Sequence, residues 1–132
     1  MREMKLSAFI LLLFVAAMFV GCEQEPKEIT ARHVLIMYQG SMRAPDSITR
    51  TNEEAKSLAE EVLAKARAGE DFGELAKQYS DGPTKIRGGL LSPFERGVMT
   101  PEFEEAAFSL KKDEISDVVE TGFGFHVIKR IK

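Results

Sequence analysis

The two histidines, His33 and His126, offer the widest choice of chemistry in this sequence. An imidazole that titrates near neutral pH can exchange protons, bind a metal or take part in a hydrogen-bond network. Both histidines lie in apolar runs, residues 32–38 and 125–131, whose β-branched and aromatic side chains predict strands. A strand histidine can equally be a half-buried residue whose ring nitrogens are satisfied by neighbours, so both a site role and a structural role remain open.

Motifs for other kinds of chemistry are missing from the sequence. One cysteine excludes an intramolecular disulfide, and one cysteine with two histidines is a poor set for a structural zinc site. Gly88-Gly89 is too short to be a phosphate-binding loop. The formal net charge of -3 lacks the basic footprint of a nucleic-acid binder. We therefore expect no metal, no cofactor and no nucleic acid as partner.

The first 21 residues have the pattern of a secretory signal peptide. Arg2 and Lys5 precede an apolar run over residues 6–20, which ends at a small residue, Gly21. The run is shorter than the ~20 residues that a membrane-spanning helix needs. We therefore predict that residues 1–21 form a signal peptide, and that the protein is exported.

The only cysteine, Cys22, directly follows this run. The segment Phe19-Val20-Gly21-Cys22 resembles the lipoprotein box of bacteria, whose cysteine is lipidated, although Leu is usual where this chain has Phe19. The resemblance implies a lipid on Cys22, a tether over residues 22–30, and anchoring to a bacterial cell-envelope membrane on its extracytoplasmic face. A plain signal peptide or an uncleaved anchor with an incidental cysteine is the alternative.

Residues 31–132 are predicted to form one α+β domain. Thr51 with Glu54, and Asp71 with Glu74, have the spacing of helix N-terminal capping boxes. Thr100-Pro101-Glu102 predicts the start of a further helix. Strands are expected at 32–38, near 90–94, at 115–120 and at 125–131, the last two forming a hairpin around Thr121-Gly122-Phe123-Gly124. The expected result is an antiparallel sheet of about four strands with helices packed around it.

Several short segments of this domain, taken in order, resemble the parvulin family of peptidyl-prolyl cis/trans isomerases. The resemblance covers nearly the whole chain after the tether and implies a four-stranded antiparallel sheet surrounded by about four helices. It implies an isomerase that acts on proline-containing unfolded or exported polypeptides, without a cofactor and as a monomer. The matching segments are residues 31–35, 48–51, 69–72, 79–81, 88–89, 94–99, 103–104, 107–108 and 122–128.

The resemblance also implies which residues form the site. In the family, two histidines meet in the sheet interior beneath the substrate, and these positions fall on His33 and His126, with the Thr121 hydroxyl beside the second. The proline pocket falls on Leu91, Met99 and Phe103, with Phe94 and Phe123 in the pocket or at its rim. Met and Phe at such spacing are more often core residues, and composition alone does not separate the two roles.

One position departs from the family pattern. After Tyr79-Ser80-Asp81, many active parvulins carry a Cys or Asp that faces the substrate carbonyl, whereas this chain has Gly82. Asp81 could supply the substitute carboxylate, or the role could be empty. Gly82-Pro83 can also be read as a simple turn. Leu90 and Ser92 differ from the usual residues as well.

The charge of the loop after the first strand bears on substrate choice. Some family members read a phosphorylated residue before proline through a basic cluster in this loop. Between Met37 and Ala44 this chain offers only Arg43. A dianionic phosphate prefers several charge-assisted donors, so we expect unmodified substrates.

Three functional hypotheses follow. The first is an enzyme, a foldase that accelerates proline isomerisation in exported proteins. The second is a binding module or chaperone that holds proline-containing segments in the same pocket with little turnover, and Gly82 favours it. The third is a lipoprotein domain that serves only as an interaction surface, against which the histidine pair and the intact apolar triplet argue.

Overall fold

The computed structural model describes residues 24–132, and the predicted signal peptide and Cys22 lie outside them. Its main sheet is antiparallel, with the strand order β2-β5-β4, formed by β2 (Ala31–Ile36), β5 (Gly124–Arg130) and β4 (Val119–Thr121). A second, two-stranded sheet pairs β1 (Glu28–Ile29) with β3 (Phe94–Glu95). None of the helices between residues 24 and 132 has the length and apolar character of a membrane span.

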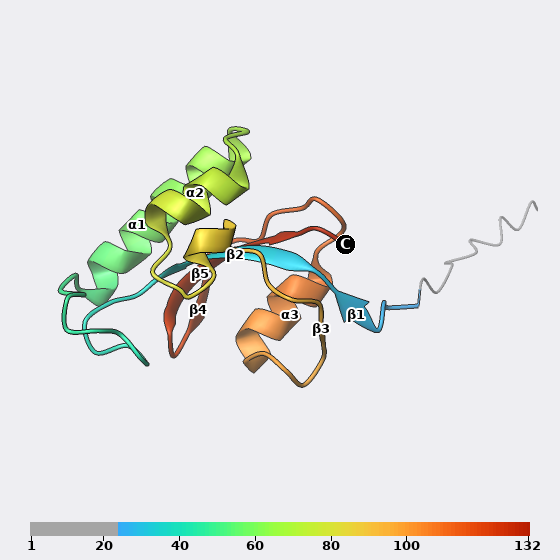
Figure 1. Ribbon diagram of the computed structural model, residues 1–132, viewed down its shortest axis with the longest axis horizontal. Helices are drawn as coiled ribbons and strands as arrows, with labels where there is room; N and C mark the ends of the chain where they lie inside the picture. Colours follow the sequence, from blue (N-terminus) through green and yellow to red (C-terminus); the bar gives the residue numbers. More distant parts are fainter. Residues whose placement is uncertain (1–23) are drawn as a thin grey trace, which may run out of the picture.

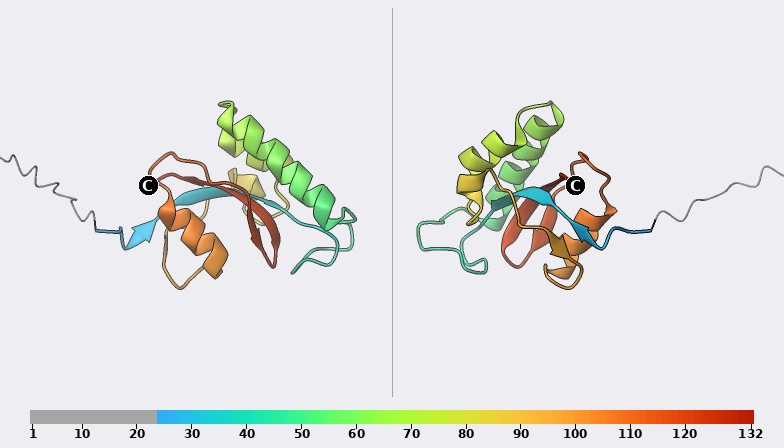
Figure 2. Two further views of the ribbon diagram at one scale, coloured as in Figure 1. Left: turned by 180° about the vertical axis from the view of Figure 1, so that it is seen from behind. Right: turned by 45° about the vertical axis from the view of Figure 1, so that its right-hand side comes forward.

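Helices cover both faces of the main sheet, as Figures 1 and 2 show. α1 (Asn52–Arg67) and α2 (Phe72–Tyr79) lie together on one face, and α3 (Pro101–Ser109) lies on the other. A short 3₁₀ turn, η1 (Lys85–Arg87), follows α2. The predicted α+β architecture, an antiparallel sheet with helices packed around it, is therefore confirmed.

Local capping sets the ends of α1 and α2 as the sequence predicts. The Glu54 backbone N–H donates to Thr51 Oγ1 at 3.1 Å, and the Glu74 N–H donates to Asp71 Oδ1 at 2.8 Å. Each bond satisfies a donor that would otherwise have no partner in the first turn. Thr100 occupies the cap position of α3, but its side chain makes no capping bond.

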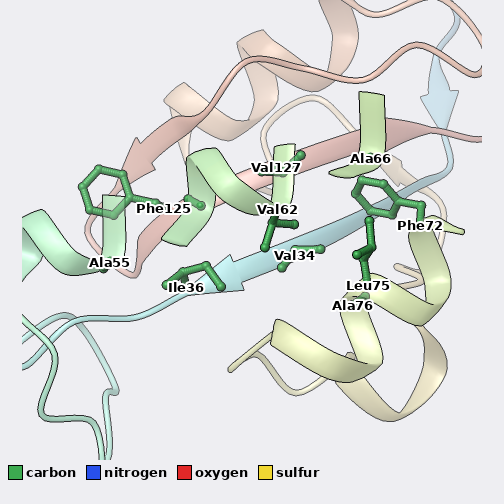
Figure 3. Packing of buried hydrophobic residues seen from close by; sticks show 11 residues of the cluster. Val34, Ile36, Ala55, Val62, Ala66, Phe72, Leu75, Ala76, Phe125 and Val127 are labelled. Atoms are coloured by element: carbon green, nitrogen blue, oxygen red, sulfur yellow. The ribbon is translucent and has the colours of Figure 1, made fainter. Parts of the chain in front are cut away.

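One hydrophobic core forms between the main sheet and the helices α1 and α2. Val34 and Ile36 alternate along β2 toward the helices, and Phe125 and Val127 do the same along β5 (Figure 3). Val62 of α1 is fully buried against them. Because successive strand residues point to opposite faces, this arrangement directs Ala31, His33 and Leu35 toward the α3 side.

The strand and helix counts differ slightly from the expected four and four. The Gly89–Leu91 stretch follows the free edge of β2, where the His33 N–H donates to Gly89 O and the Leu91 N–H donates to Ala31 O, both at 3.0 Å. Only one bridge, between Arg32 and Leu90, forms there. This segment occupies the place of a fourth strand but is too short to continue as one. Beside the three α-helices, the only further helical element of residues 24–132 is η1, a 3₁₀ turn of three residues.

Two predicted strands end differently in the structure. β2 stops at Ile36 because the Met37 N–H donates to the Asp81 carboxylate and the Tyr38 N–H donates to Ser41 Oγ, not to a neighbouring strand. The strand expected over residues 115–120 is reduced to an isolated Ile115 bridge followed by β4.

The fold begins earlier than the predicted domain start at residue 31. Ile29 pairs with Phe94 in the small sheet and is only 1% exposed. Thr30 then exchanges backbone hydrogen bonds with the last residues of the chain, including Thr30 N–H to Lys132 O at 3.1 Å. The last part of the predicted tether is therefore folded, because Ile29 supplies apolar surface that packs beside α3.

Candidate functional site

The strand register brings the two histidines together. Leu35 of β2 stands opposite His126 of β5, and His33 lies two residues before Leu35 on the same face. The two rings are close to parallel, and their Nδ1 atoms are 3.2 Å apart. The juxtaposition expected from the family resemblance is present, at 7% and 5% exposure.

A threonine hydroxyl completes each end of the histidine pair. Thr84 Oγ1 lies 3.2 Å from His33 Nε2, and Thr121 Oγ1 lies 2.7 Å from His126 Nε2. The result is a buried chain of four side chains. With both rings neutral, all four ring nitrogens can be satisfied whichever way the chain of donors runs, since a hydroxyl donates or accepts.

Burial keeps both histidines neutral. It lowers the pKa of His33 to about 4, and burial together with the neighbouring His33 lowers the pKa of His126 to about 3. At neutral pH the site therefore presents two uncharged imidazoles. Such a pair can orient groups and set local polarity without carrying a net charge.

A cavity of about 600 Å³ opens above the histidine pair. Of the predicted pocket residues, Leu91, Met99, Phe103 and Phe123 line it. The Phe103 ring stands edge-on to both imidazoles, with centroids 5.5 Å from His33 and 5.2 Å from His126. The remaining apolar lining comes from Leu35, Met37, Pro45, Pro83 and Val98.

Phe94 does not line this cavity, contrary to the expectation that it lies in the pocket or at its rim. It is 3% exposed and packs in the core beside α3. Its ring centroid lies 6.1 Å from that of Phe103 and 5.9 Å from that of Phe108. β3 pairs with β1 at this point, and the pairing places the Phe94 side chain behind the pocket.

Asp81 lines the cavity, but its carboxylate is already engaged. One oxygen, Oδ2, accepts from Arg50 Nη1 at 2.6 Å and from the Met37 N–H at 3.0 Å. The pair with Arg50 compensates the negative charge and fixes the loop that follows β2. Asp81 is thus a partly buried carboxylate at the cavity wall, and it forms an ion pair with Arg50.

Gly82 is buried beside Asp81 and does not line the cavity. Its N–H donates to Ser80 Oγ at 3.3 Å. An added Cβ would lie 3.5 Å from Leu35 Cβ, which is ordinary van der Waals contact. Steric crowding of the Cβ position therefore does not explain the glycine.

Two threonines at the cavity escaped the sequence reasoning. Thr84 bonds His33, and Thr100 also lines the cavity. Oγ1 of Thr100 is buried and is the only such side-chain atom of the described residues without a hydrogen-bond partner. No local motif marks Thr84, because its partner is 51 residues away. Thr100 was recognised only as a helix cap.

The charged groups at the cavity are few. Among the lining residues that the structure describes, Arg43 is the one lysine or arginine, and Asp81 is the one carboxylate. Arg43 adopts a left-handed backbone conformation, with φ of 60°. Within residues 24–132, no group of three or more His, Cys, Asp or Glu side chains could hold a metal ion.

Comparison with known proteins agrees with this geometry. The family model described as the PPIC-type PPIase domain matches residues 17–131. The chain is 57% identical over 75 residues to a foldase protein PrsA of Caldanaerobacter subterraneus subsp. tengcongensis, covering 56% of this chain and 24% of that protein. It is 40% identical over 116 residues to a peptidyl-prolyl cis-trans isomerase Pin1 of Digitalis lanata, covering 79% of this chain and 96% of the relative.

The solved structures give the same result. Peptidyl-prolyl isomerase ESS1 from Candida albicans superposes with a TM-score of 0.73 at 36% identity, covering 80% of this chain and 63% of that one. The chain spans only a quarter to a third of the PrsA foldases it matches, 24% of one and 35% of another. Fold, histidine pair and family match agree, and the chain belongs to the PPIC-type, or parvulin, family of peptidyl-prolyl cis/trans isomerases.

Proposed function

We propose that this chain catalyses cis/trans isomerisation of X-Pro peptide bonds in unfolded polypeptides. The observation that carries the proposal is the apolar cavity directly above a buried, neutral histidine pair. Rotation about a peptide bond is opposed by amide resonance, with a barrier of ~18–20 kcal/mol. Resonance separates charge, so a dry apolar site disfavours the planar amide relative to the twisted one.

The residues divide the work between binding and orientation. Leu91, Met99 and Phe103 supply the apolar surface against which a proline ring packs. His33 and His126 form the polar floor beneath it. The mechanism breaks no covalent bond, and therefore the site requires no nucleophile.

Three further side chains complete the site around the histidine pair. Thr121 holds His126 in orientation, and Phe123 closes one wall of the cavity. Asp81, paired with Arg50, fixes another part of the cavity lining. Asp81 is the carboxylate nearest in sequence to the position of the usual Cys or Asp. Because Arg50 already compensates its charge, we propose that Asp81 shapes the cavity lining and does not act on the substrate carbonyl.

The direct test is a protease-free exchange measurement on a short Leu-Pro peptide. NMR exchange spectroscopy reports the cis-to-trans rate, and uncatalysed exchange takes tens to hundreds of seconds. Catalytic amounts of the protein should shorten this time in proportion to enzyme concentration. Exchange that stays at the uncatalysed rate while the peptide binds would contradict the enzyme proposal.

We further propose that the substrates are not phosphorylated before proline. Arg43 is the one cation among the described residues of the cavity wall, and Lys85 and Arg87, in the η1 turn, are not part of that wall. A phosphate carries about −1.5 to −2 charges, and a single exposed cation binds it weakly in water. Matched Ser-Pro and phospho-Ser-Pro peptides should isomerise at similar rates; a large gain with the phosphopeptide that Arg43→Ala abolishes would contradict this.

The setting that we propose is the outer side of a bacterial membrane. The signal segment and the lipoprotein-box resemblance at Cys22 support export and lipid anchoring. Residues 23–27 separate Cys22 from β1, and such a stretch reaches at most roughly 20 Å when extended. An anchored domain would therefore work close to the membrane surface, where exported chains emerge unfolded.

A second candidate function is a proline-segment binding module or chaperone with little turnover. Gly82 favours it, because no side chain stands where many parvulins carry a Cys or Asp. Introducing that side chain decides between the two. The Cβ of Gly82→Cys would make only ordinary van der Waals contacts, the nearest at 3.5 Å from Leu35 Cβ. A large gain in exchange rate without a change in peptide affinity would indicate that the natural chain mainly binds.

A further inference from the structure

Arg32 stands next to His33 in β2, but its side chain points to the opposite face of the sheet. On that face, its Nη1 donates to two backbone carbonyls, Gly88 O at 3.0 Å and Arg87 O at 3.2 Å. A guanidinium offers several donors in a fixed plane, which suits two adjacent acceptors. Arg32 therefore clamps the end of η1 against the sheet.

The clamped segment approaches the strand very closely. Gly88 and Gly89 both have left-handed backbone conformations, with φ of 63° and 77°. An added Cβ at Gly88 would lie 2.7 Å from Arg32 Nη1, and one at Gly89 would lie 2.1 Å from the His33 carbonyl oxygen. Only glycines allow the turn to reach the guanidinium on one side and the strand backbone on the other.

The same turn carries Thr84, whose hydroxyl meets His33 Nε2 in the site. The Gly89 N–H donates to Thr84 O at 2.9 Å, so the residue next to the clamp is bonded directly to Thr84. The segment thus passes around the edge of β2 from the Arg32 face to the His33 face. Movement of its end at Gly88 would be transmitted to Thr84.

We propose that Arg32 is a positioning residue of the site, which fixes the Thr84 hydroxyl against His33 through the turn over residues 84–89. The inference rests on the proposed isomerase function, since it assigns Arg32 a part in that reaction. Hydrogen bonds from a charged donor are stronger than neutral ones, and this strength suits a clamp at a partly exposed position. Arg32 is not part of the cavity lining, so it would act on the reaction only through Thr84.

The first test replaces Arg32 and compares turnover with binding. Arg32→Met keeps a long apolar stem but removes both hydrogen bonds. We expect kcat/KM for a Leu-Pro peptide to fall about tenfold, which corresponds to roughly 1.4 kcal/mol, with peptide affinity nearly unchanged. Arg32→Lys, which retains a single point donor, should recover part of the loss.

Arg87→Ala is the matched control. It removes an equal charge from the same surface groove but retains the backbone carbonyl that Arg32 uses. Turnover in this variant should equal that of the natural chain. A tenfold loss in Arg87→Ala as well would indicate that surface charge, not the clamp, matters, and would overturn the proposal.

A double-mutant cycle separates positioning from a general structural effect. If Arg32 acts through Thr84, then Arg32→Met should lower kcat/KM no further in a Thr84→Val background. Additive losses would contradict the proposal. Should Arg32→Met fail to fold, the same cycle is run with Arg32→Lys.

A measurement on the free protein makes the test independent of catalysis. The ¹⁵N chemical shift of His33 Nε2 reports its hydrogen bond to Thr84. It should move in Arg32→Met toward the value in Thr84→Val and stay constant in Arg87→Ala. An unchanged shift in Arg32→Met refutes positioning even if the natural chain is active. A chain without isomerase activity in which the shift moves as expected refutes only the proposed function.

Discussion

Acidification should destabilise this domain through its two buried histidines. Each binds a proton in the unfolded chain near the ordinary histidine pKa of 6.5, but in the folded protein only at about pH 4 for His33 and about pH 3 for His126. The unfolded state therefore binds more protons below pH 6.5. The stability that depends on neutral rings is complete above pH 6.5 and is lost as the pH falls toward 4 and 3.

The magnitude follows from the two shifts. One proton contributes about 1.4 kcal/mol per pH unit, so two histidines give a slope of at most about 2.7 kcal/mol per unit once the pH is well below 6.5. Integrated from pH 7.5 to pH 5, the loss is at most about 4 kcal/mol. This is a large part of the 5–15 kcal/mol of an ordinary domain.

Urea unfolding between pH 7.5 and pH 5 measures this loss directly. The range stays above the titration of ordinary carboxylates, near pH 4, so the histidines dominate it. The double variant His33→Gln/His126→Gln cannot titrate at these positions and should give a flat profile. NMR titration of the two rings in the natural chain provides the same answer without a variant. Unfolding free energies that do not change with pH over this range, or ring pKa values near 6.5, would refute the assignment of a buried neutral pair.

Four further predictions concern single side chains. Phe103→Ala should lower the unfolding free energy by about 3–5 kcal/mol, because Phe103 is 4% exposed and belongs to the core as well as to the cavity. Met99→Ala should mainly weaken peptide binding, and titration calorimetry measures the affinity. Thr100→Val should leave stability unchanged or raise it by about 1 kcal/mol in thermal unfolding, since it removes a buried hydroxyl without a partner, and a loss above that size would contradict the assignment. Cys22→Ala should release the protein from membranes or block its processing, and unchanged fractionation and processing would argue against lipid anchoring.

The burial of Phe103 changes what truncation can reveal about the pocket. Truncation of a pocket residue that lies open to substrate should impair binding more than folding. The structure places its ring between the imidazoles and the Phe94 side chain. A large stability loss in this variant is therefore compatible with a pocket role. Met99, which is only partly buried, is the cleaner probe.

Elements set by neighbours in sequence were predictable. The caps at Thr51 and Asp71 involve residues three positions apart, so composition and spacing carry the whole signal. The hairpin of β4 and β5 is similarly local. Predicting that the two histidines meet required the family resemblance, because they are 93 residues apart in the sequence. Their contact depends on the register of β2 against β5, which no local pattern sets.

Features that depend on distant partners escaped prediction. The pairing of β1 with β3 buries Phe94 and orders Ile29, yet neither strand is long enough to produce a periodic pattern. Thr84 gains its role only from a turn that glycines bring against β2. The direction of such side chains is decided by tertiary packing, which a local pattern does not encode.

The measurement that tests the central claim most directly compares two methionines. Met99 lines the cavity above the histidine pair, whereas Met42 is 56% exposed and does not belong to the lining. Exchange spectroscopy on a Leu-Pro peptide should show catalysis by the natural chain and by Met42→Ala, and a clear loss of kcat/KM in Met99→Ala at unchanged fold. Equal losses in both variants, or no acceleration by the natural chain, would contradict the claim that proline is isomerised in this cavity.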